Sequence, residues 1–232
     1  MRRVVVTGMG ALTPIGNDVD SYWNGLLSGT SGCAEITHFD AAKFKTKFAC
    51  EVKEFVVTDF IDRKESRKLD RFCQFAVVVA DQAFNDSGLV KEKINGDRAG
   101  VIWGSGIGGM KTFYSESVNF GTGNGIPRFN PFFIPKLISD IPAGHISIKY
   151  NLKGPNSSPV TACATGTHAI GDSFTIIKND KADLMVCGGA EAAICPLGIS
   201  GFSAARALCD NFNDEPERGS RPWDKDRSGF VM

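Results

Sequence analysis

A short apolar segment that breaks into a helix at a cysteine constrains this chain more than any other feature. Residues 155–159, Pro-Asn-Ser-Ser-Pro, punctuate the approach, and Val160 to Ala162 are compatible with a buried strand. From Ala164 onward the segment lacks proline and is rich in small residues, which favours a helix. Cys163 is therefore predicted to lie at a helix N-terminus.

This position favours a catalytic role for Cys163. Unpaired backbone N–H groups and the positive end of the helix dipole favour a thiolate over a thiol. Small and apolar residues continue through Ile177, so the helix is predicted to be buried. Cysteine is also among the residues most often buried, so a purely structural Cys163 remains the alternative.

No histidine is an obvious base for this cysteine. His168 follows by five residues, which turns it about 140° away and raises it about 7.5 Å along a helix. His38 and His145 carry no local motif, and each is predicted to be structural.

Composition excludes several classes of function. Lysine plus arginine equals aspartate plus glutamate at 26 each, so no bulk field draws the chain to nucleic acid or to an anionic membrane. No window approaches the roughly 18 apolar residues of a membrane span. Seven unclustered cysteines with no zinc-type spacing indicate reduced thiols, no metal and a cytoplasmic protein.

Strand and helix patterns alternate along the chain, which indicates a layered α/β fold. The pattern becomes irregular from Pro196 to Leu208. The main predicted elements are a strand at 2–8, a helix capped by Asn17 or Asp18, a long helix stopped by Gly88, strands at 99–103 and 183–187, and a helix over 137–150 interrupted near Pro142.

Three stretches permit more than one interpretation. Residues 63–68 place four cations at the start of the long helix, against its dipole, which indicates either a solvated face or a dock for an acidic partner.

Residues 104–109 match GxGxxG after a strand, but no acidic residue follows at the spacing that holds a ribose. The glycines have a simpler explanation: because they lack side chains, they allow a neighbouring element to approach the backbone closely. Phe129, Phe132 and Phe133 lie in a loop, either pinned into a core or presented to a partner chain.

Motifs along the whole chain resemble one family, the β-ketoacyl-acyl carrier protein synthases, and within it the elongating synthase II type of bacterial fatty acid synthesis. They are, in order, VVVTGMGALTPIGN, GSGIGG, PFFIP, TACATGTHAIG, MVCGGAE, GFSAARAL and SRPWDKDRSGFVM. The resemblance implies that residues 1–232 form one domain, the first of the two similar halves of a thiolase-like fold. A layered mixed sheet and a buried helix after the nucleophile are then expected.

The resemblance also implies roles for individual residues. Cys163 matches the nucleophile that takes the acyl chain as a thioester, and its backbone N–H resembles half of the oxyanion hole. Ile107 and Phe202 match acyl-pocket positions, and Phe133 matches a position that reaches the partner subunit's pocket. The positions that match the basic dock for acyl carrier protein are Lys64, Arg67, Lys68 and Arg206.

The expected activity is decarboxylating condensation of an acyl thioester with malonyl-acyl carrier protein, by a cytoplasmic homodimer without a cofactor. The family's two catalytic histidines, its supporting lysine and its second oxyanion donor belong to the second half, so this chain alone is not expected to condense substrates. A non-catalytic carrier-binding or scaffold subunit is the alternative. A dinucleotide-dependent oxidoreductase is a weaker one.

Overall fold

The computed structural model describes residues 2–123 and 125–232. The chain divides into two compact units. The first comprises Met1–Gly10 and Val56–Ala192, and the second comprises Ala11–Phe55 and Ala193–Met232. Cys163 belongs to the first unit.

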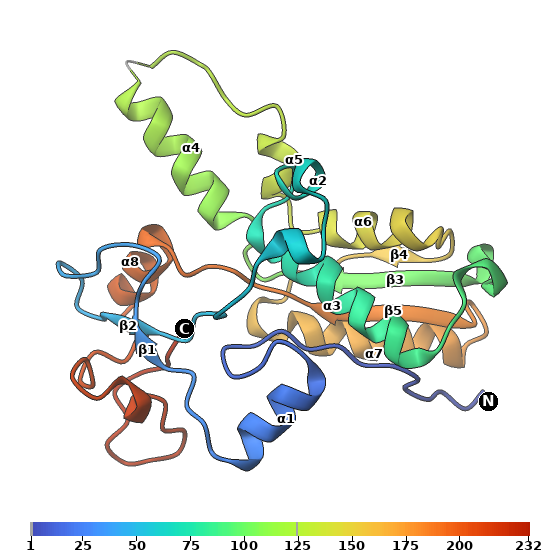
Figure 1. The fold of residues 1–232 in the computed structure, drawn as a ribbon, viewed down its shortest axis with the longest axis horizontal. Coiled ribbons are helices and arrows are strands. Elements are labelled where there is room, and N and C mark those ends of the chain that lie inside the picture. The colour runs from blue at the N-terminus through green and yellow to red at the C-terminus, as the bar shows by residue number, and fades with distance from the viewer. Residues whose placement is uncertain (1, 124) are drawn as a thin grey trace. The chain divides into compact units, whose positions relative to one another are not determined.

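A three-stranded parallel sheet, in the order β4-β3-β5, forms the centre of the first unit (Figure 1). Strand β3 (Ala99–Gly104) pairs along its whole length with β5 (Leu184–Gly189) and at its other edge with β4 (Asn156–Ser157). Every residue of β3 is buried, as expected for a parallel strand covered on both faces.

Helices cover both faces of this sheet (Figure 1). Helices α3 (Arg71–Ser87) and α6 (Ile141–Tyr150) pack on one face, and α7 (Thr165–Lys178) packs on the other. The layered α/β prediction is confirmed, although antiparallel pairing among the described residues is found in the second unit and not in this sheet. The core between the sheet and the first two helices includes Ala76, Ala80, Phe84, Val101, Trp103, Ala143 and Ile146.

The predicted long helix is two helices. Asp70 caps α3 by accepting a hydrogen bond from Phe72 N, and Gly88 ends it at a φ of 66°. Four of the preceding residues form a separate helix, α2 (Arg63–Ser66), whose first N–H groups bond to the Asp62 side chain. Because this carboxylate lies at the N-terminus of α2, the expected conflict between the cations and the dipole is reduced.

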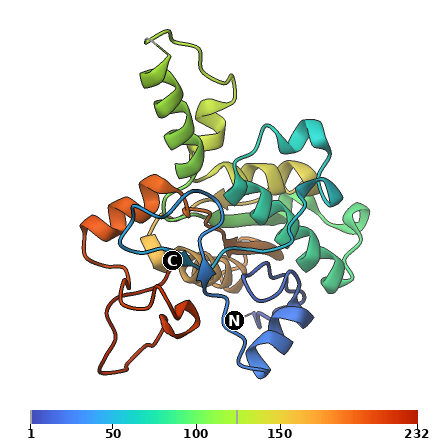
Figure 2. The same cartoon turned by 60° about the vertical axis from the view of Figure 1, so that its left-hand side comes forward.

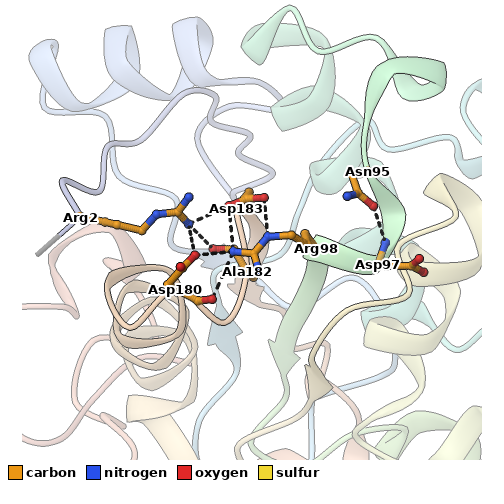
Figure 3. Close-up of polar contacts among 7 residues, drawn as sticks. All are labelled: Arg2, Asn95, Asp97, Arg98, Asp180, Ala182 and Asp183. Atoms are coloured by element: carbon orange, nitrogen blue, oxygen red, sulfur yellow. Dashed lines mark hydrogen bonds and ion pairs between the residues drawn. The ribbon is translucent and has the colours of Figure 1, made fainter.

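The predicted strand at residues 2–8 is wrong. A strand needs a ladder partner for its backbone groups, and the structure assigns none to this segment within the described chain. Side chains hold it instead. Arg2 bonds to Asp183 and to the Ala182 carbonyl, beside Arg98, which bonds to Asp180 and Asp183 (Figure 3).

Helix α4 (Met110–Thr122) projects away from the sheet of the first unit (Figure 2). The helix expected over 137–150 with an interruption near Pro142 is the helix α6, which begins at Ile141, and Leu137 ends the separate helix α5 (Phe133–Leu137). Pro142 falls in the first turn of α6, where its missing N–H removes no helical hydrogen bond. Short 3₁₀ turns complete the unit at Val57–Asp59, Lys91–Lys93, Gly96–Arg98 and Ala162–Ala164.

The second unit contains two helices and an antiparallel pair. Helix α1 (Val19–Leu27) is capped by Asp18, as predicted. Strands β1 (Ala34–Glu35) and β2 (Phe48–Ala49) pair with each other. Helix α8 (Pro196–Ala204) replaces the predicted irregular stretch, and a 3₁₀ turn follows at Pro216–Arg218. Across the described residues of both units, no helix is long and apolar enough to cross a membrane.

Candidate functional site

Cys163 is exposed and occupies the middle of the 3₁₀ turn that leads directly into α7. Its predicted place at a helix N-terminus is confirmed. The strand expected at Val160–Ala162 is wrong, because Val160 is exposed and Ala162 adopts a φ of 51°, which ends any extended conformation.

Thr165 holds the turn around Cys163. Its hydroxyl accepts a hydrogen bond from Thr161 N at 2.9 Å and donates one to the Ala162 carbonyl at 2.7 Å. A left-handed conformation costs a non-glycine residue such as Ala162 about 1–2 kcal/mol. The backbone N–H of Cys163 bonds to no acceptor in the described chain, so it is available to a reacting carbonyl oxygen.

Helix α7 is buried on one face only. Thr165, Ala169 and Ser173 recur every four residues and face the sheet. Ile170 and Phe174 are 56% and 46% exposed. The predicted burial of this helix therefore holds for the face toward the sheet, whereas no described residue covers Ile170 and Phe174.

Glycines at the end of β3 allow the Cys163 turn to approach the sheet. A Cβ on Gly104 would lie 2.2 Å from Thr165 Cγ2 and 2.3 Å from the Pro159 carbonyl oxygen. A Cβ on Gly106 would lie 3.2 Å from the Ala162 carbonyl oxygen. The GxGxxG pattern is thus explained by close packing, as the second of its two interpretations proposed.

Glu191 fills the position where a nucleotide phosphate would bind this loop. Its carboxylate accepts hydrogen bonds from Gly106 N at 2.8 Å, Ile107 N at 3.1 Å and the Ser105 hydroxyl at 2.9 Å. Glu191 is exposed as a residue, but the loop partly withdraws its carboxyl from water and so raises its pKa. A phosphate would have to displace this carboxylate, which argues against dinucleotide binding. Sequence reasoning missed Glu191, although it directly follows Gly188-Gly189-Ala190 at the end of β5.

Ile107 and Phe133 lie on adjoining segments. Ile107 is half-buried, and two residues later Gly109 N donates to the Leu137 carbonyl at the end of α5. Phe133 begins α5 and stacks on Phe129, whose ring stacks in turn on Phe120 at the end of α4. Phe120 and Phe129 stay exposed, so these aromatics pack on one another and not within a core.

The expected docking residues of the first unit lie on α2 and directly after it. Lys64 and Arg67 are exposed, and neither pairs with an acid among the described residues. Lys68 is more constrained, with its ammonium 2.6 Å from Glu65 Oε1 and 5.8 Å from the centroid of the Phe132 ring.

Phe202 and Arg206 belong to the second unit. Phe202 lies on α8 and meets the Phe230 ring edge-on at 5.3 Å. Arg206 is exposed, adopts a φ of 56° and lines a pocket of about 280 Å³ together with Lys45 and Ser203. Asp210 also lines this pocket, so its wall carries two cations and one acidic residue.

Among the described residues of the first unit, no histidine forms a hydrogen bond with the Cys163 thiol. His168 Nδ1 lies 2.6 Å from the Thr161 hydroxyl, in line with the expectation that it faces away from the thiol. His38 lies beside Glu51, with 3.5 Å between Nδ1 and Oε1. Burial on α6 lowers the pKa of His145.

Comparisons with known proteins agree with one another. The family model described as "Beta-ketoacyl synthase, N-terminal domain" matches residues 1–232. The chain is 49% identical over 231 residues to 3-oxoacyl-[acyl-carrier-protein] synthase 2 of Synechocystis sp., covering 100% of this chain and 55% of the relative. It is 50% identical over the same length, with the same coverage, to the synthase 2 of Coxiella burnetii.

A solved structure of a type II polyketide synthase acyl carrier protein in complex with its ketosynthase, bound to the hexaketide, matches with a TM-score of 0.86 and 28% identity. That match covers 99% of this chain and 55% of the other. The fold is therefore thiolase-like. The chain spans about half the length of the curated relatives that it matches.

Proposed function

The chain belongs to the β-ketoacyl synthase family, and we propose that it supplies the acyl-accepting nucleophile of an elongating 3-oxoacyl-acyl carrier protein synthase. The observation that carries this proposal is Cys163, an exposed thiol on a strained turn at the start of α7 with an unoccupied backbone N–H. Residues 1–232 would form the nucleophile-bearing domain of that enzyme.

The first chemical step is thioester exchange. The Cys163 sulfur attacks the carbonyl carbon of an acyl thioester, and the Cys163 N–H stabilises the oxyanion that forms. The carrier's sulfur then leaves and takes the proton that the thiol gave up. In the second step the malonyl group loses carbon dioxide, the resulting carbanion attacks the acyl-cysteine, and the Cys163 sulfur leaves. Decarboxylation also requires acid–base groups, which the family resemblance assigns to the second half of such synthases.

Ile107, Phe133 and Phe202 are proposed to line the acyl site. Support comes from the loop that carries Ile107, because its Gly106 packs against the Ala162 carbonyl beside the nucleophile. Phe133 is tied to the same loop through the bond from Gly109 N to the Leu137 carbonyl. Phe202 has aromatic packing in its own unit, so its substitution would also test stability there.

Acyl carrier protein is the proposed partner of the basic residues Lys64, Arg67, Lys68 and Arg206. The matched ketosynthase is described in complex with such a carrier. Lys64→Glu and Arg67→Glu should raise KM for the carrier substrate and leave kcat nearly unchanged, because a docking contact stabilises the bound substrate and the transition state equally. Lys93→Glu, an exposed cation outside the α2 region, should change neither.

A homodimer is the proposed assembly, and cytoplasm the proposed location. Support for the dimer comes from apolar side chains that remain exposed on α4 and the segment after it, including Val118, Ile126 and Ile134. Val118→Glu should dissociate a dimer in sedimentation velocity, whereas Ser115→Glu on the same helix is the matched control. The proposed location rests on the sequence, because an odd number of scattered cysteines is typical of reduced thiols in a cytoplasm.

The activity itself can be tested with the protein expressed from its whole reading frame, acyl-carrier and malonyl-carrier. Formation of 3-oxoacyl-carrier and carbon dioxide that Cys163→Ala abolishes and Cys187→Ala retains would support the proposal. Elongation that survives Cys163→Ala would contradict it. Carrier binding without acylation of Cys163 would instead favour the scaffold alternative.

A further inference from the structure

Two cysteines outside the proposed active site lie in contact in the second unit. Cys33 Sγ and Cys50 Sγ are 3.1 Å apart. Cys33 is 8% exposed, and Cys50 is half-buried. Neither residue takes part in the proposed condensation.

The register of the antiparallel pair explains this contact. Ala34 pairs with Ala49 and Glu35 with Phe48, so one further step places Cys33 directly opposite Cys50. Ile36 N donates to the Lys47 carbonyl, which makes Ile36 and Lys47 a hydrogen-bonded pair. Paired positions alternate in type along an antiparallel ladder, so Cys33 and Cys50 fall on a non-hydrogen-bonded pair.

That pair type brings side chains closest together. Opposite Cα atoms there are about 4.5 Å apart, which lies within the range that a disulfide spans. Cys50 N is free of this ladder and donates to the Met232 carbonyl at 2.7 Å. A bond between the two sulfurs would therefore need no change in strand pairing.

We propose that Cys33 and Cys50 form a reversible disulfide, an oxidation site independent of Cys163. A peroxide is the oxidant. It converts one thiol to a sulfenic acid and releases water, and the second thiol then displaces the oxygen as a second water. Two thiols lose two protons and two electrons, and one peroxide takes them up. A thiol reductant reverses the reaction by exchange.

Cys209 is the nearest competitor, because it shares a hydrophobic cluster with Cys33 and Phe48. Its sulfur accepts a hydrogen bond from the Ser228 hydroxyl instead. Burial and the neighbouring Cys33 raise the pKa of Cys50 to about 12, although Lys53 opposes the rise. The pair should therefore react more slowly than a thiolate-rich cysteine would.

Peptide mapping tests this site directly. The reduced chain is treated with hydrogen peroxide, its remaining thiols are alkylated, and it is digested with trypsin without reductant. Cleavage after Arg3, Lys43, Lys47 and Lys53 places Cys33 in peptide 4–43 and Cys50 alone in peptide 48–53. We expect these two peptides to be joined, and to separate after dithiothreitol.

Variants give the controls. Cys33→Ser and Cys50→Ser should each abolish the joined peptide, and Cys209→Ser should retain it. Recovery of both cysteines as alkylated thiols or as sulfonic acids, after peroxide has oxidised other cysteines, would overturn the proposal. A crosslink from either cysteine to Cys209 would also overturn it. Neither result bears on acylation of Cys163.

Discussion

Glu191 Oε2 accepts a hydrogen bond from the backbone nitrogen of Gly106 at 2.8 Å. The same carboxylate bonds to Ile107 N and to the Ser105 hydroxyl, and the Ser105 oxygen accepts from Gly108 N. One acidic side chain thus organises the loop that packs against the residue preceding Cys163.

Removal of this carboxylate should therefore disturb both stability and the nucleophile. Glu191→Ala leaves three donors without their acceptor, and such losses cost about 1–3 kcal/mol when the donors are buried. Glu191→Gln keeps an acceptor oxygen and should lose less. Urea unfolding measures the change in the free energy of unfolding. The rate of Cys163 alkylation shows whether the turn around the thiol has changed. Equal behaviour of both variants and the wild type would show that the loop does not depend on Glu191.

The lowered pKa of Asp183 leads to a second prediction, about the stability of the fold at acidic pH. Hydrogen bonds from Arg98 and Arg2 hold the pKa of Asp183 well below its usual range (Figure 3). A lowered folded-state pKa stabilises the fold above the unfolded pKa of about 3.9, and this contribution is lost as the pH falls below it.

Asp183→Asn should flatten the dependence of the unfolding free energy on pH in that acidic window. Asp97→Asn is the control, since the Asp97 carboxylate forms no ion pair with the described residues. The free energy of unfolding is measured as a function of pH across the acidic range. Parallel curves for the wild type and Asp183→Asn would contradict the prediction.

Packing on α6 gives a matched pair of isoleucines. Ile146 is fully buried between α6 and the sheet, whereas Ile148 is 80% exposed. Ile146→Ala should lower the free energy of unfolding by about 2–5 kcal/mol through lost burial and a residual cavity. Ile148→Ala should change it little. Similar losses for both variants would place the core of this unit elsewhere.

Elements with strong local signals could be predicted from the sequence. Asp18 before an apolar helix, Gly88 after one, and the apolar strand at 99–103 each carry their own signal, and the structure contains all three. The position of Cys163 before a helix was predictable for the same reason.

Other features depend on distant residues or on backbone detail. The segment at 2–8 has the composition of a strand, but a ladder requires a partner elsewhere in the chain. Helix α8 contains Gly198 and Gly201, which weaken a helical pattern that tertiary packing restores. The positive φ of Ala162 and the contact of Glu191 with the glycine loop have no short-range sequence signal.

The role of Cys163 as the acyl-accepting nucleophile is tested by locating the site of acyl transfer. The chain is incubated with an acyl-acyl carrier protein, digested at acidic pH and mapped by mass spectrometry. We expect one acyl thioester, on Cys163, absent from Cys163→Ala and present in Cys187→Ala. An acyl group on another residue, or a protein that stays unacylated while the carrier binds, would contradict it.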